Sequence, residues 1–326
     1  MIDLSIIIPV YNCEAFLEKG FSHLRTLYAS SVSFEIIYVN DGSTDNSLTV
    51  LEKIQSENNY INVLSQKNGG VTRAQNAGLE IAQGSYITFL DADDWLDANV
   101  LIRAVLASQK DNLDMYGFSM QKANEKCELL SIVNSHPITY NKVASGVHFL
   151  TEGYQPSSIC PFVFSSDFLK SNHLRFVNDI THKDVEISVR MFLKAQRVFF
   201  VEEVGYYYYT NTNSITQSKD IDRVHQYMMD TVLVAKLVND NCTVNNSVVL
   251  NEIIRRQSNS IVWNLLLRIF KNTDELSWGF INSLKKDLMD KEVYPINGQL
   301  KTRFQRITRM VMNSYLYWTI VKLKTK

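Results

Sequence analysis

The 326-residue chain has only four cysteines, and no two of them stand in a C-x-x-C spacing. This scarcity argues against a disulfide framework and against a zinc site built on cysteines, and it is typical of a reducing compartment. The chain also lacks any uncharged apolar run of about 18 residues, which a membrane-spanning helix would need. Its N-terminus enters a predicted strand directly, without the segments of a signal peptide. We therefore expect a cytoplasmic protein.

Neither sign of charge dominates the chain. The formal net charge is −1 at pH 7, so the molecule as a whole has no electrostatic attraction for nucleic acid, and no nucleic-acid partner is expected. An apolar content of 45% and a charged content of 21% are ordinary for a globular protein with an ample core. No G-x-G-x-x-G follows the first predicted strand, which makes a nicotinamide-dependent dehydrogenase a poor interpretation.

Charge is distributed unevenly near the C-terminus. Seven basic residues and no acidic residue lie between positions 295 and 326, where apolar residues recur at roughly helical spacing. A basic amphipathic helix of this kind can lie on an anionic membrane surface, which would make residues 301–326 a peripheral contact with the inner face of the membrane. The same pattern is expected for a terminal helix that packs on the protein with its Lys and Arg in solvent. Periodicity alone does not separate these two interpretations.

The first hundred residues alternate between predicted strands and predicted helices. Strands are predicted at 4–10, 34–39, 62–65 and 85–90, and helices at 13–28, 43–57, 72–83 and 95–109. Near-continuous apolar strands between helices indicate a mostly parallel, Rossmann-like α/β sheet covered on both faces. Ligands of such sheets bind beyond the carboxyl ends of the strands. From about residue 220 the pattern is helical, so we predict an α/β domain at 1–218 and a helical region at 219–326.

Three carboxylates follow the fourth predicted strand directly, at Asp91, Asp93 and Asp94. Carboxylates this close repel one another unless a cation or a set of donors compensates them. A common reason to build such a cluster is a Mg²⁺ or Mn²⁺ ion that bridges one or two carboxylates to a diphosphate. The alternative is that Asp94 caps the next helix with Asp97 at its third position, but this would explain only one of the three carboxylates. The metal–diphosphate interpretation is therefore favoured.

Other polar segments have a structural and a functional interpretation side by side. The Asp41-Gly-Ser-Thr segment is expected to form a turn in which Ser43 or Thr44 caps the next helix, and a calcium loop fits less well. The glycine-rich approach to a helix at 68–70 could offer backbone N–H groups to an anion. Thr181 and Asp184 form a predicted capping box, although a carboxylate at a helix N-terminus is also favoured in the ionised form that a general base needs.

Together these segments resemble family 2 glycosyltransferases with the GT-A fold, of the kind that assembles bacterial surface polysaccharides. The resemblance covers residues 3–216, and it rests on four motifs in order at 5–12, 35–47, 68–78 and 84–94, the last containing a D-x-D. It implies a metal-dependent, inverting transferase that moves a sugar from a nucleotide-sugar, with a UDP-sugar as the expected donor. The acceptor would be a hydroxyl of a glycan or a lipid-linked saccharide.

The resemblance also implies the roles of individual residues. Asp184 would be the catalytic base, and Asp93 and Asp94 would hold Mn²⁺ or Mg²⁺. Pro9 and Tyr11 would line the uridine pocket, and Asp41 would hydrogen-bond the nucleotide base. The whole nucleotide-sugar site would comprise Pro9, Val10, Tyr11, Asp41, Asn68, Gly70, Arg73, Asn76, Asp91, Ala92 and Asp93.

Some positions depart from the family pattern. Gln75 stands where an arginine usually precedes the asparagine, and Lys183 stands where a glutamate usually lies beside the base. Thr210 and Thr212 replace arginines that often follow the tyrosines at 206–209, a run that is expected either to form a strand edge or an acceptor-facing wall, or to begin a loop. These changes keep an alternative open, in which the protein is a catalytically weak, nucleotide-sugar-binding subunit of a polysaccharide-assembly complex. Homo-oligomerisation through the C-terminal helices is compatible with the sequence.

Overall fold

The computed structural model describes residues 2–124, 129–133, 138–210, 220–300 and 302–325. The chain divides into two compact units. Unit 1 comprises Met1–Asp179 and Arg190–Thr212, and unit 2 comprises Ile180–Val189 and Asn213–Lys326. The domain boundary predicted after residue 218 falls in the segment 211–219, which lies outside the described residues.

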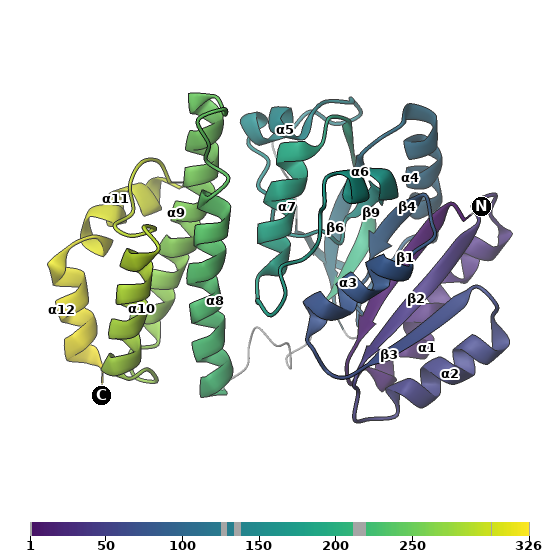
Figure 1. Ribbon diagram of the computed structural model, residues 1–326, viewed down its shortest axis with the longest axis horizontal. Coiled ribbons are helices and arrows are strands. Elements are labelled where there is room, and N and C mark those ends of the chain that lie inside the picture. The colour runs from purple at the N-terminus through teal and green to yellow at the C-terminus, as the bar shows by residue number, and fades with distance from the viewer. Residues whose placement is uncertain (1, 125–128, 134–137, 211–219, 301, 326) are drawn as a thin grey trace. The chain divides into compact units, whose positions relative to one another are not determined.

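A mixed β-sheet forms the centre of unit 1 (Figure 1). Its strands are β1 Leu4–Val10, β2 Phe34–Asp41, β3 Ile61–Gln66, β4 Tyr86–Phe89, β5 Trp95–Leu96, β6 Met115–Ala123, β7 Leu129–Ile132, β8 Phe162–Ser165 and β9 Val198–Tyr209. They are ordered β3-β2-β1-β4-β8-β6-β9-β5, and β7 pairs with β6. The half formed by β3, β2, β1 and β4 is parallel, as predicted. The sheet then continues through antiparallel pairs at β4–β8, β8–β6 and β9–β5, so it is mixed as a whole.

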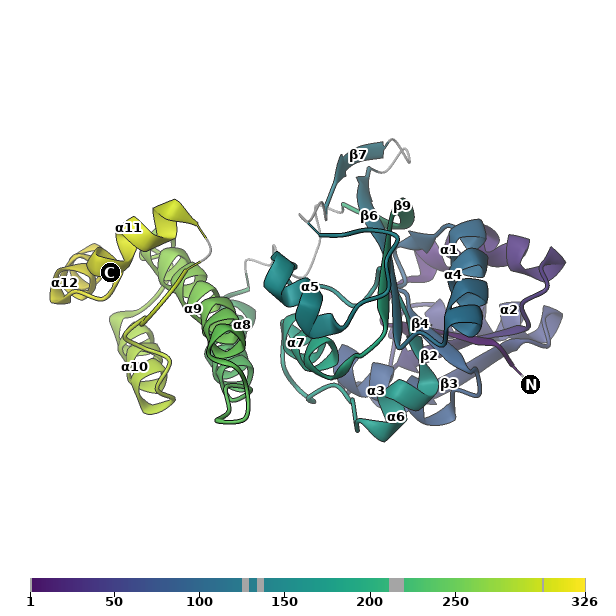
Figure 2. The same cartoon turned by 90° about the horizontal axis from the view of Figure 1, so that it is seen from above.

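Helices cover both faces of this sheet (Figure 2). They are α1 Glu14–Leu24 with the 3-10 turn η1 Arg25–Ala29, α2 Ser47–Glu57, α3 Val71–Ile81, α4 Ala98–Asp111, α5 Gly146–Glu152, α6 Ser166–Ser171 and α7 Lys183–Lys194, which has residues in both units. Helices α1, α2 and α4 lie on one face and α3 lies on the other. Helix α3 approaches β1 closely because Gly78 has no side chain, and a Cβ there would lie 2.5 Å from Ile7 Cγ2.

One helix of unit 1 begins later than the sequence predicts, and one strand settles an alternative that the sequence left open. The helix predicted from residue 95 begins at Ala98, because Asp97 Oδ1 accepts from the N–H groups of Asn99 and Val100 at 2.9 and 3.0 Å. Asp97 is therefore the cap, and the alternative that Asp94 caps this helix is wrong. The tyrosine run at 206–209, for which the sequence allowed a strand edge or the start of a loop, belongs to β9, whose pairing with β5 and β6 continues to Tyr209.

Unit 2 is helical, as predicted for the C-terminal region. After the first turns of α7 it contains α8 Ile221–Asn239, α9 Val248–Lys271, α10 Trp278–Asp290, α11 Arg303–Met312 and α12 Tyr315–Lys324. Its core is a cluster of buried apolar side chains from all of α8–α12, including Val232, Leu266, Leu284, Met312 and Trp318. Among the described residues, none of the helices combines the length and the apolar character that crossing a membrane requires.

Candidate functional site

The carboxyl ends of β1, β2 and β4 meet at one edge of the sheet. The strand register pairs Val10 with Asn40, and the N–H of Leu90 donates to the carbonyl of Ile7 at 3.0 Å. The residues that follow these strands, at 11–12, 41–43 and 91–94, are therefore neighbours. This edge carries most of the residues predicted to bind the nucleotide-sugar, including Pro9, Val10 and Tyr11 at the end of β1 and after it.

The turn after β1 is tied to the turn after β2. Asn12 has a left-handed backbone (φ +52°), its Oδ1 accepts from the N–H of Thr44 at 2.8 Å, and its own N–H donates to Ser43 Oγ at 3.1 Å. Neither Ser43 nor Thr44 caps α2, which begins at Ser47 without a side-chain cap on Asn46. The capping expected there is wrong, and the two residues instead hold the β1 turn. The Tyr11 side chain remains exposed at this turn.

Asp41 fixes the glycine-rich segment that leads into α3. Its Oδ1 accepts from Gln66 Nε2 at 2.7 Å and from the N–H of Gly69 at 2.9 Å, and its Oδ2 accepts from the N–H of Gly70 at 2.7 Å. Two of the N–H groups that the sequence offers to an anion are therefore bound by a protein carboxylate. Gly70 adopts φ +84°, which favours glycine at this position. The contact of Asp41 with a nucleotide base stays a prediction.

Asp94 is almost fully buried and joins the acidic segment to the end of β9. The Tyr206 hydroxyl donates to Asp94 Oδ2 at 2.5 Å, and the N–H of Tyr209 donates to Oδ1 at 2.7 Å. Burial, together with the charges of Asp91 and Asp93, raises the pKa of Asp94 well above its usual range. Both of its oxygens accept from protein donors, so Asp94 supports the acidic segment structurally. It also lines the same cavity as Asp93, and its role as a metal ligand stays a prediction.

Asp91 and Asp93 lie on either side of Ala92 in this segment. The N–H of Asp91 donates to the Tyr206 hydroxyl at 3.3 Å, so one tyrosine contacts both ends of the acidic segment. Asp93 is half-buried, and this burial raises the pKa of its carboxyl group. Asp93 lines a cavity of about 150 Å³ together with side chains from α1 and with Tyr209.

The donor set around Asp93 decides whether a metal ion fits. Among the described residues, no group of three or more His, Cys, Asp or Glu side chains is placed to hold a metal by itself. Mg²⁺ uses only one or two protein carboxylates and takes its other ligands from water and substrate phosphates. A single half-buried carboxylate beside a cavity therefore suits an ion that arrives with a diphosphate. It does not suit a closed structural metal site.

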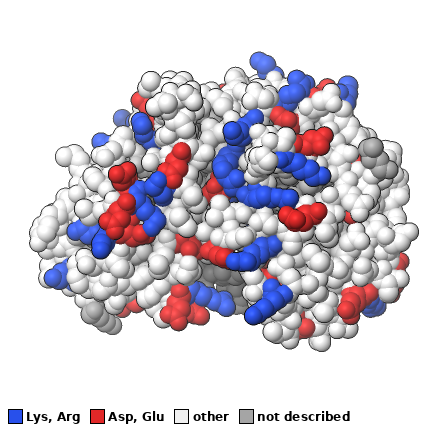
Figure 3. Space-filling model, viewed as in Figure 1, with Lys and Arg blue, Asp and Glu red and all other residues white. Residues whose placement is uncertain are grey.

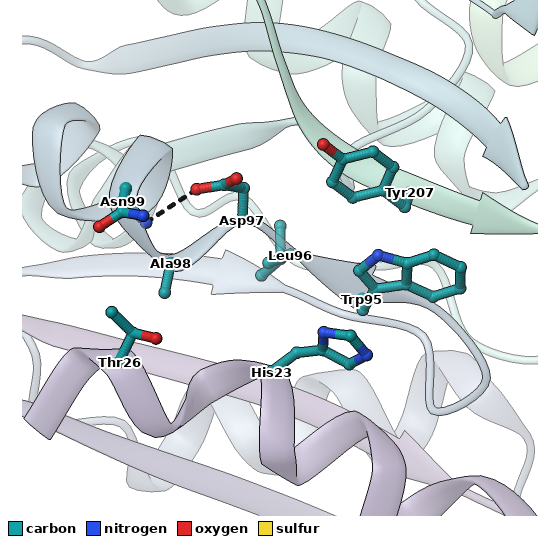
Figure 4. A pocket seen from close by; sticks show the side chains of 8 residues that line it. All are labelled: His23, Thr26, Trp95, Leu96, Asp97, Ala98, Asn99 and Tyr207. Atoms are coloured by element: carbon teal, nitrogen blue, oxygen red, sulfur yellow. Dashed lines mark hydrogen bonds between the residues drawn. The ribbon is translucent and has the colours of Figure 1, made fainter. Parts of the chain in front are cut away.

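A larger cavity of about 370 Å³ lies beside the first and shares His23 and Trp95 with it (Figure 4). The Trp95 ring stacks with His23 at 5.5 Å and with Tyr207 at 5.6 Å between ring centroids. Asp97 also lines this cavity, but one of its oxygens is used to cap α4. Sequence reasoning missed this aromatic wall because His23 lies 72 positions before Trp95 in the chain.

Arg73 and Asn76, both predicted to bind the donor, contact residues 176–179, at the end of the first of the two stretches that make up unit 1. Arg73 forms a two-pronged ion pair with Asp179, with Nε–Oδ1 and Nη2–Oδ2 distances of 2.9 and 2.7 Å, and this pair lowers the pKa of Asp179. Asn76 Nδ2 donates to the carbonyl of Phe176 at 2.9 Å, and Asn76 Oδ1 accepts from the N–H of Phe176 at 3.0 Å. In this structure both side chains hold residues 176–179, and their roles toward the donor stay predictions.

Gln75, between these two residues, is fully buried in α3. Within the part of the chain that the structure describes, neither its Nε2 nor its Oε1 has a hydrogen-bond partner. An unsatisfied buried polar group costs roughly 1–3 kcal/mol. Gln75 is therefore a local source of instability at the position where the resemblance implies an arginine.

Asp184 belongs to unit 2, in the first turn of α7. Lys183 Nζ donates to Asp184 Oδ1 at 2.9 Å, and the Asp184 side chain is 24% exposed. The predicted capping box is not formed, because Thr181 Oγ1 has no hydrogen-bond partner among the described residues and the helix begins only at Lys183. The backbone N–H of Thr181 instead donates to Asp230 Oδ2 of α8 at 2.8 Å. Asp184 is thus not explained as a cap.

Comparison with known proteins adds to this geometry. Residues 5–162 match the sequence model of the family described as Glycosyl transferase family 2. The chain is 28% identical to the uncharacterized glycosyltransferase EpsJ of Bacillus subtilis over 66% of this chain and 63% of that protein. It is 24% identical to the poly(ribitol-phosphate) beta-N-acetylglucosaminyltransferase TarS of Staphylococcus aureus over 64% of this chain but 36% of that protein. The matched segment therefore spans less than two thirds of either relative.

Solved structures show the same fold. The crystal structure of S. aureus TarS 1-349 in complex with UDP-GlcNAc superposes with a TM-score of 0.69 at 17% sequence identity, covering 98% of this chain and 91% of that one. At this level of identity the likeness concerns the fold alone. The α/β architecture with a helical C-terminal region is thus the predicted GT-A-like fold.

Proposed function

Because residues 5–162 form a family 2 glycosyltransferase domain, we propose that this protein transfers a sugar from a nucleotide-sugar to a hydroxyl of a glycan or lipid-linked acceptor in bacterial polysaccharide biosynthesis. The observation that carries the proposal is the acidic segment at the sheet edge, where Asp93 faces a cavity while Asp94 is held by Tyr206 and Tyr209. The hydrogen-bonded Asp94 side chain fixes the segment that carries the half-buried carboxylate of Asp93, as expected of a preorganised site.

The donor would bind along the carboxyl ends of β1, β2 and β4. The exposed Tyr11 ring supports this placement because it offers an aromatic face to a nucleotide base. Pro9, Val10, Asn68, Gly70 and Ala92 would line the same edge. A UDP-sugar is the expected donor, since TarS, which shares the fold, binds UDP-GlcNAc.

Asp93 would hold Mn²⁺ or Mg²⁺ together with the oxygens of the donor diphosphate. Such an ion, when bound, neutralises the charge that develops on the leaving diphosphate. Asp91 would contact the ribose or the sugar. Asp94 would keep the segment in place through its bonds to β9, beside the ion that Asp93 holds.

Asp184 would act as general base in a single displacement. Its carboxylate accepts the proton of the acceptor hydroxyl, whose oxygen forms the new bond to the anomeric carbon. The bond from that carbon to the diphosphate breaks, and its electron pair leaves with the nucleotide, so the anomeric configuration is inverted. Lys183 donates to Oδ1, so we assign the incoming proton to Oδ2.

One observation favours a second candidate function, a catalytically weak nucleotide-sugar-binding subunit of an assembly complex. The ammonium group of Lys183 donates to Asp184 Oδ1 at 2.9 Å, so one of the two oxygens that a general base would use already has a protein partner. Binding of the nucleotide would be unaffected by this ion pair, whereas proton transfer would be slowed.

A screen of UDP-, GDP- and dTDP-sugars, each with and without Mn²⁺, tests both candidates. We expect Mn²⁺-dependent release of nucleotide from at least one UDP-sugar, together with a rise in Tm on binding UDP. A rise in Tm without any sugar release or transfer would favour the binding subunit. If none of the nucleotides changed Tm or turned over, both candidates would be excluded.

A further inference from the structure

The C-terminal helices α11 and α12 carry an unusual concentration of exposed apolar side chains. The two helices contact each other at the end of the chain (Figure 2). Seven large apolar residues on them are 51% to 84% exposed: Phe304, Ile307, Met310, Val311, Tyr315, Leu316 and Leu323. We call these seven residues, with the basic residues Arg303, Arg306 and Lys322 beside them, the terminal surface. Monomeric proteins rarely leave large apolar surfaces open, so this many exposed apolar side chains on two helices that touch each other indicate a binding surface.

Helix α11 presents its apolar face outward. At about 100° per residue, Phe304, Ile307, Met310 and Val311 fall within roughly 120° of one another. All four are exposed, whereas the buried positions of this helix are Gln305 and Met312. A surface helix of a globular protein normally has the opposite arrangement, with its apolar stripe facing the core. The orientation of α11 is therefore explained only if something outside the helical unit covers the apolar face.

Helix α12 is firmly anchored by its other face. The Tyr317 hydroxyl donates to the carbonyl of Leu266 at 2.5 Å, and Trp318 Nε1 donates to the Tyr294 hydroxyl at 2.8 Å. Val321 is fully buried in the same core. Because these residues fix the rotation of α12, the exposure of Tyr315, Leu316 and Leu323 is a property of the fold and not of a frayed end.

Charge identifies what covers the terminal surface. Residues 302–325 contain five basic residues and no acidic one, whereas basic and acidic side chains are interspersed over the face of the molecule in Figure 3. A second copy of this chain would bring two sets of like charges together, which is unfavourable. A partner that is apolar inside and negatively charged at its surface satisfies both features, and an anionic lipid membrane has this chemistry.

Helix length determines how the contact is made. Each of the two helices has ten residues, which is about 15 Å of helix against roughly 30 Å of hydrocarbon in a bilayer. We propose that the terminal surface lies flat on an anionic membrane, with its apolar side chains at the acyl boundary and its Arg and Lys side chains among the headgroup phosphates. This interaction goes beyond sugar transfer, because it would hold the enzyme where a lipid-linked acceptor resides.

Co-sedimentation of the full chain with vesicles tests this inference. One set of vesicles contains phosphatidylcholine alone and the other contains phosphatidylcholine with phosphatidylglycerol. We expect binding to the anionic vesicles that weakens as salt is raised. The double variant Ile307→Ser/Met310→Ser should bind at least roughly tenfold more weakly, because the burial of two apolar side chains is lost. The double variant Arg303→Gln/Arg306→Gln should lose the preference for anionic lipid.

Val248 and Val249 supply a matched control. They are exposed apolar residues at the start of α9 in the same unit, so Val248→Ser/Val249→Ser should bind vesicles like the wild type. All variants should keep the wild-type Tm and the wild-type response to UDP, which separates this test from that of the proposed function. Two results would overturn the inference: no binding of the wild type to anionic vesicles, or a dimer in solution that Ile307→Ser/Met310→Ser dissociates.

Discussion

The acidic segment of unit 1 and the terminal surface of unit 2 both depart from the usual distribution of residues, in opposite ways. In the first, a carboxylate is buried; in the second, apolar side chains are exposed. The buried carboxyl group of Asp94 is hydrogen-bonded within the protein by Tyr206 and Tyr209. On α11, by contrast, the side chains of Ile307, Met310 and Val311 are more than half exposed. A buried polar group that has hydrogen-bond partners within the protein indicates a structural role. Apolar side chains that the fold leaves in solvent indicate a surface that binds another molecule.

The same distinction applies within the acidic segment, and the strongest prediction follows from it. Asp93→Asn should reduce transfer by roughly 10³-fold, because several kcal/mol of electrostatic stabilisation by the metal would be lost. The Tm should change little, since Asp93 is not the carboxylate that joins the segment to β9. Initial rates with Mn²⁺ and a UDP-sugar measure the effect, with the exposed Glu57→Gln as the control. A variant that kept the wild-type rate would show that Asp93 is only a scaffold.

The next largest effect is expected at the base. Asp184→Asn should lower kcat by at least roughly 10²-fold, as for the loss of a general base, and should leave UDP binding intact. Lys183→Met removes the ammonium group beside it and should raise kcat or leave it unchanged. Steady-state rates and UDP titrations of both variants make the comparison. If Lys183→Met were as inactive as Asp184→Asn, the lysine would be part of the catalytic machinery and not a restraint on it.

A stability measurement tests the scaffold assignment of Asp94. Tyr206→Phe removes a donor from a buried carboxylate and should lower the free energy of unfolding by roughly 1–3 kcal/mol. Tyr207→Phe is the matched control, because the neighbouring ring points to the other side of the strand and stacks on Trp95. Urea titrations followed by circular dichroism compare the two variants. Equal stability of both would mean that the hydrogen bond to Asp94 contributes little.

Gln75 offers a smaller effect in the opposite direction. Gln75→Met replaces an unsatisfied buried amide with an apolar side chain of similar size and should stabilise the protein by about 1 kcal/mol. The same urea titration measures this change. A parallel UDP titration tests whether the Gln75 amide contributes to nucleotide binding. Weaker UDP binding by Gln75→Met than by the wild type would show that it does.

The smallest effect is expected from pH. Only the ionised form of Asp93 can ligate a metal, and burial raises the pKa of this group. Proton binding therefore competes with Mn²⁺, and the Mn²⁺-dependent part of the UDP-induced rise in Tm should shrink as pH falls from about 7 to about 5. The Mn²⁺-independent part should not follow this dependence. If the effect of Mn²⁺ on Tm did not depend on pH, the assignment of Asp93 as the metal ligand would be wrong.

Local patterns in the sequence were sufficient for much of the fold. The continuous apolar runs of β1 and β2 indicated buried parallel strands, and helical spacing indicated α5 and the C-terminal helices. The extent of β9 was not predictable in this way, because its tyrosines become a strand only through pairing with β5 and β6. The N-cap of α4 was not predictable for a related reason. Asp94 and Asp97 are both residues that commonly cap a helix, and Asp94 is instead bound by Tyr206, which is 112 positions away in the sequence.

The candidate site shows the same limit. Spacing placed Asp41, Asp91 and Asp93 at one edge of the sheet, where the structure has them. It could not reveal that Asp41 holds the glycine-rich segment, since that contact forms between residues 28 positions apart. Nor could it show that Arg73 pairs with Asp179 across 106 positions. The residue types and their order predict where the functional site lies. Which of its residues support the structure and which face a ligand depends on contacts between residues that are distant in the sequence.

The stacking of Trp95 between His23 and Tyr207 has a practical consequence. The other three tryptophans of the chain all lie beyond residue 260, so Trp95 is the sole indole in unit 1. It is also the next residue after Asp94 and lines the same cavity as Asp93. Its emission spectrum is therefore an intrinsic optical probe of the acidic segment. In a background with Trp263, Trp278 and Trp318 replaced by phenylalanine, donor occupancy could be followed in real time without any attached label.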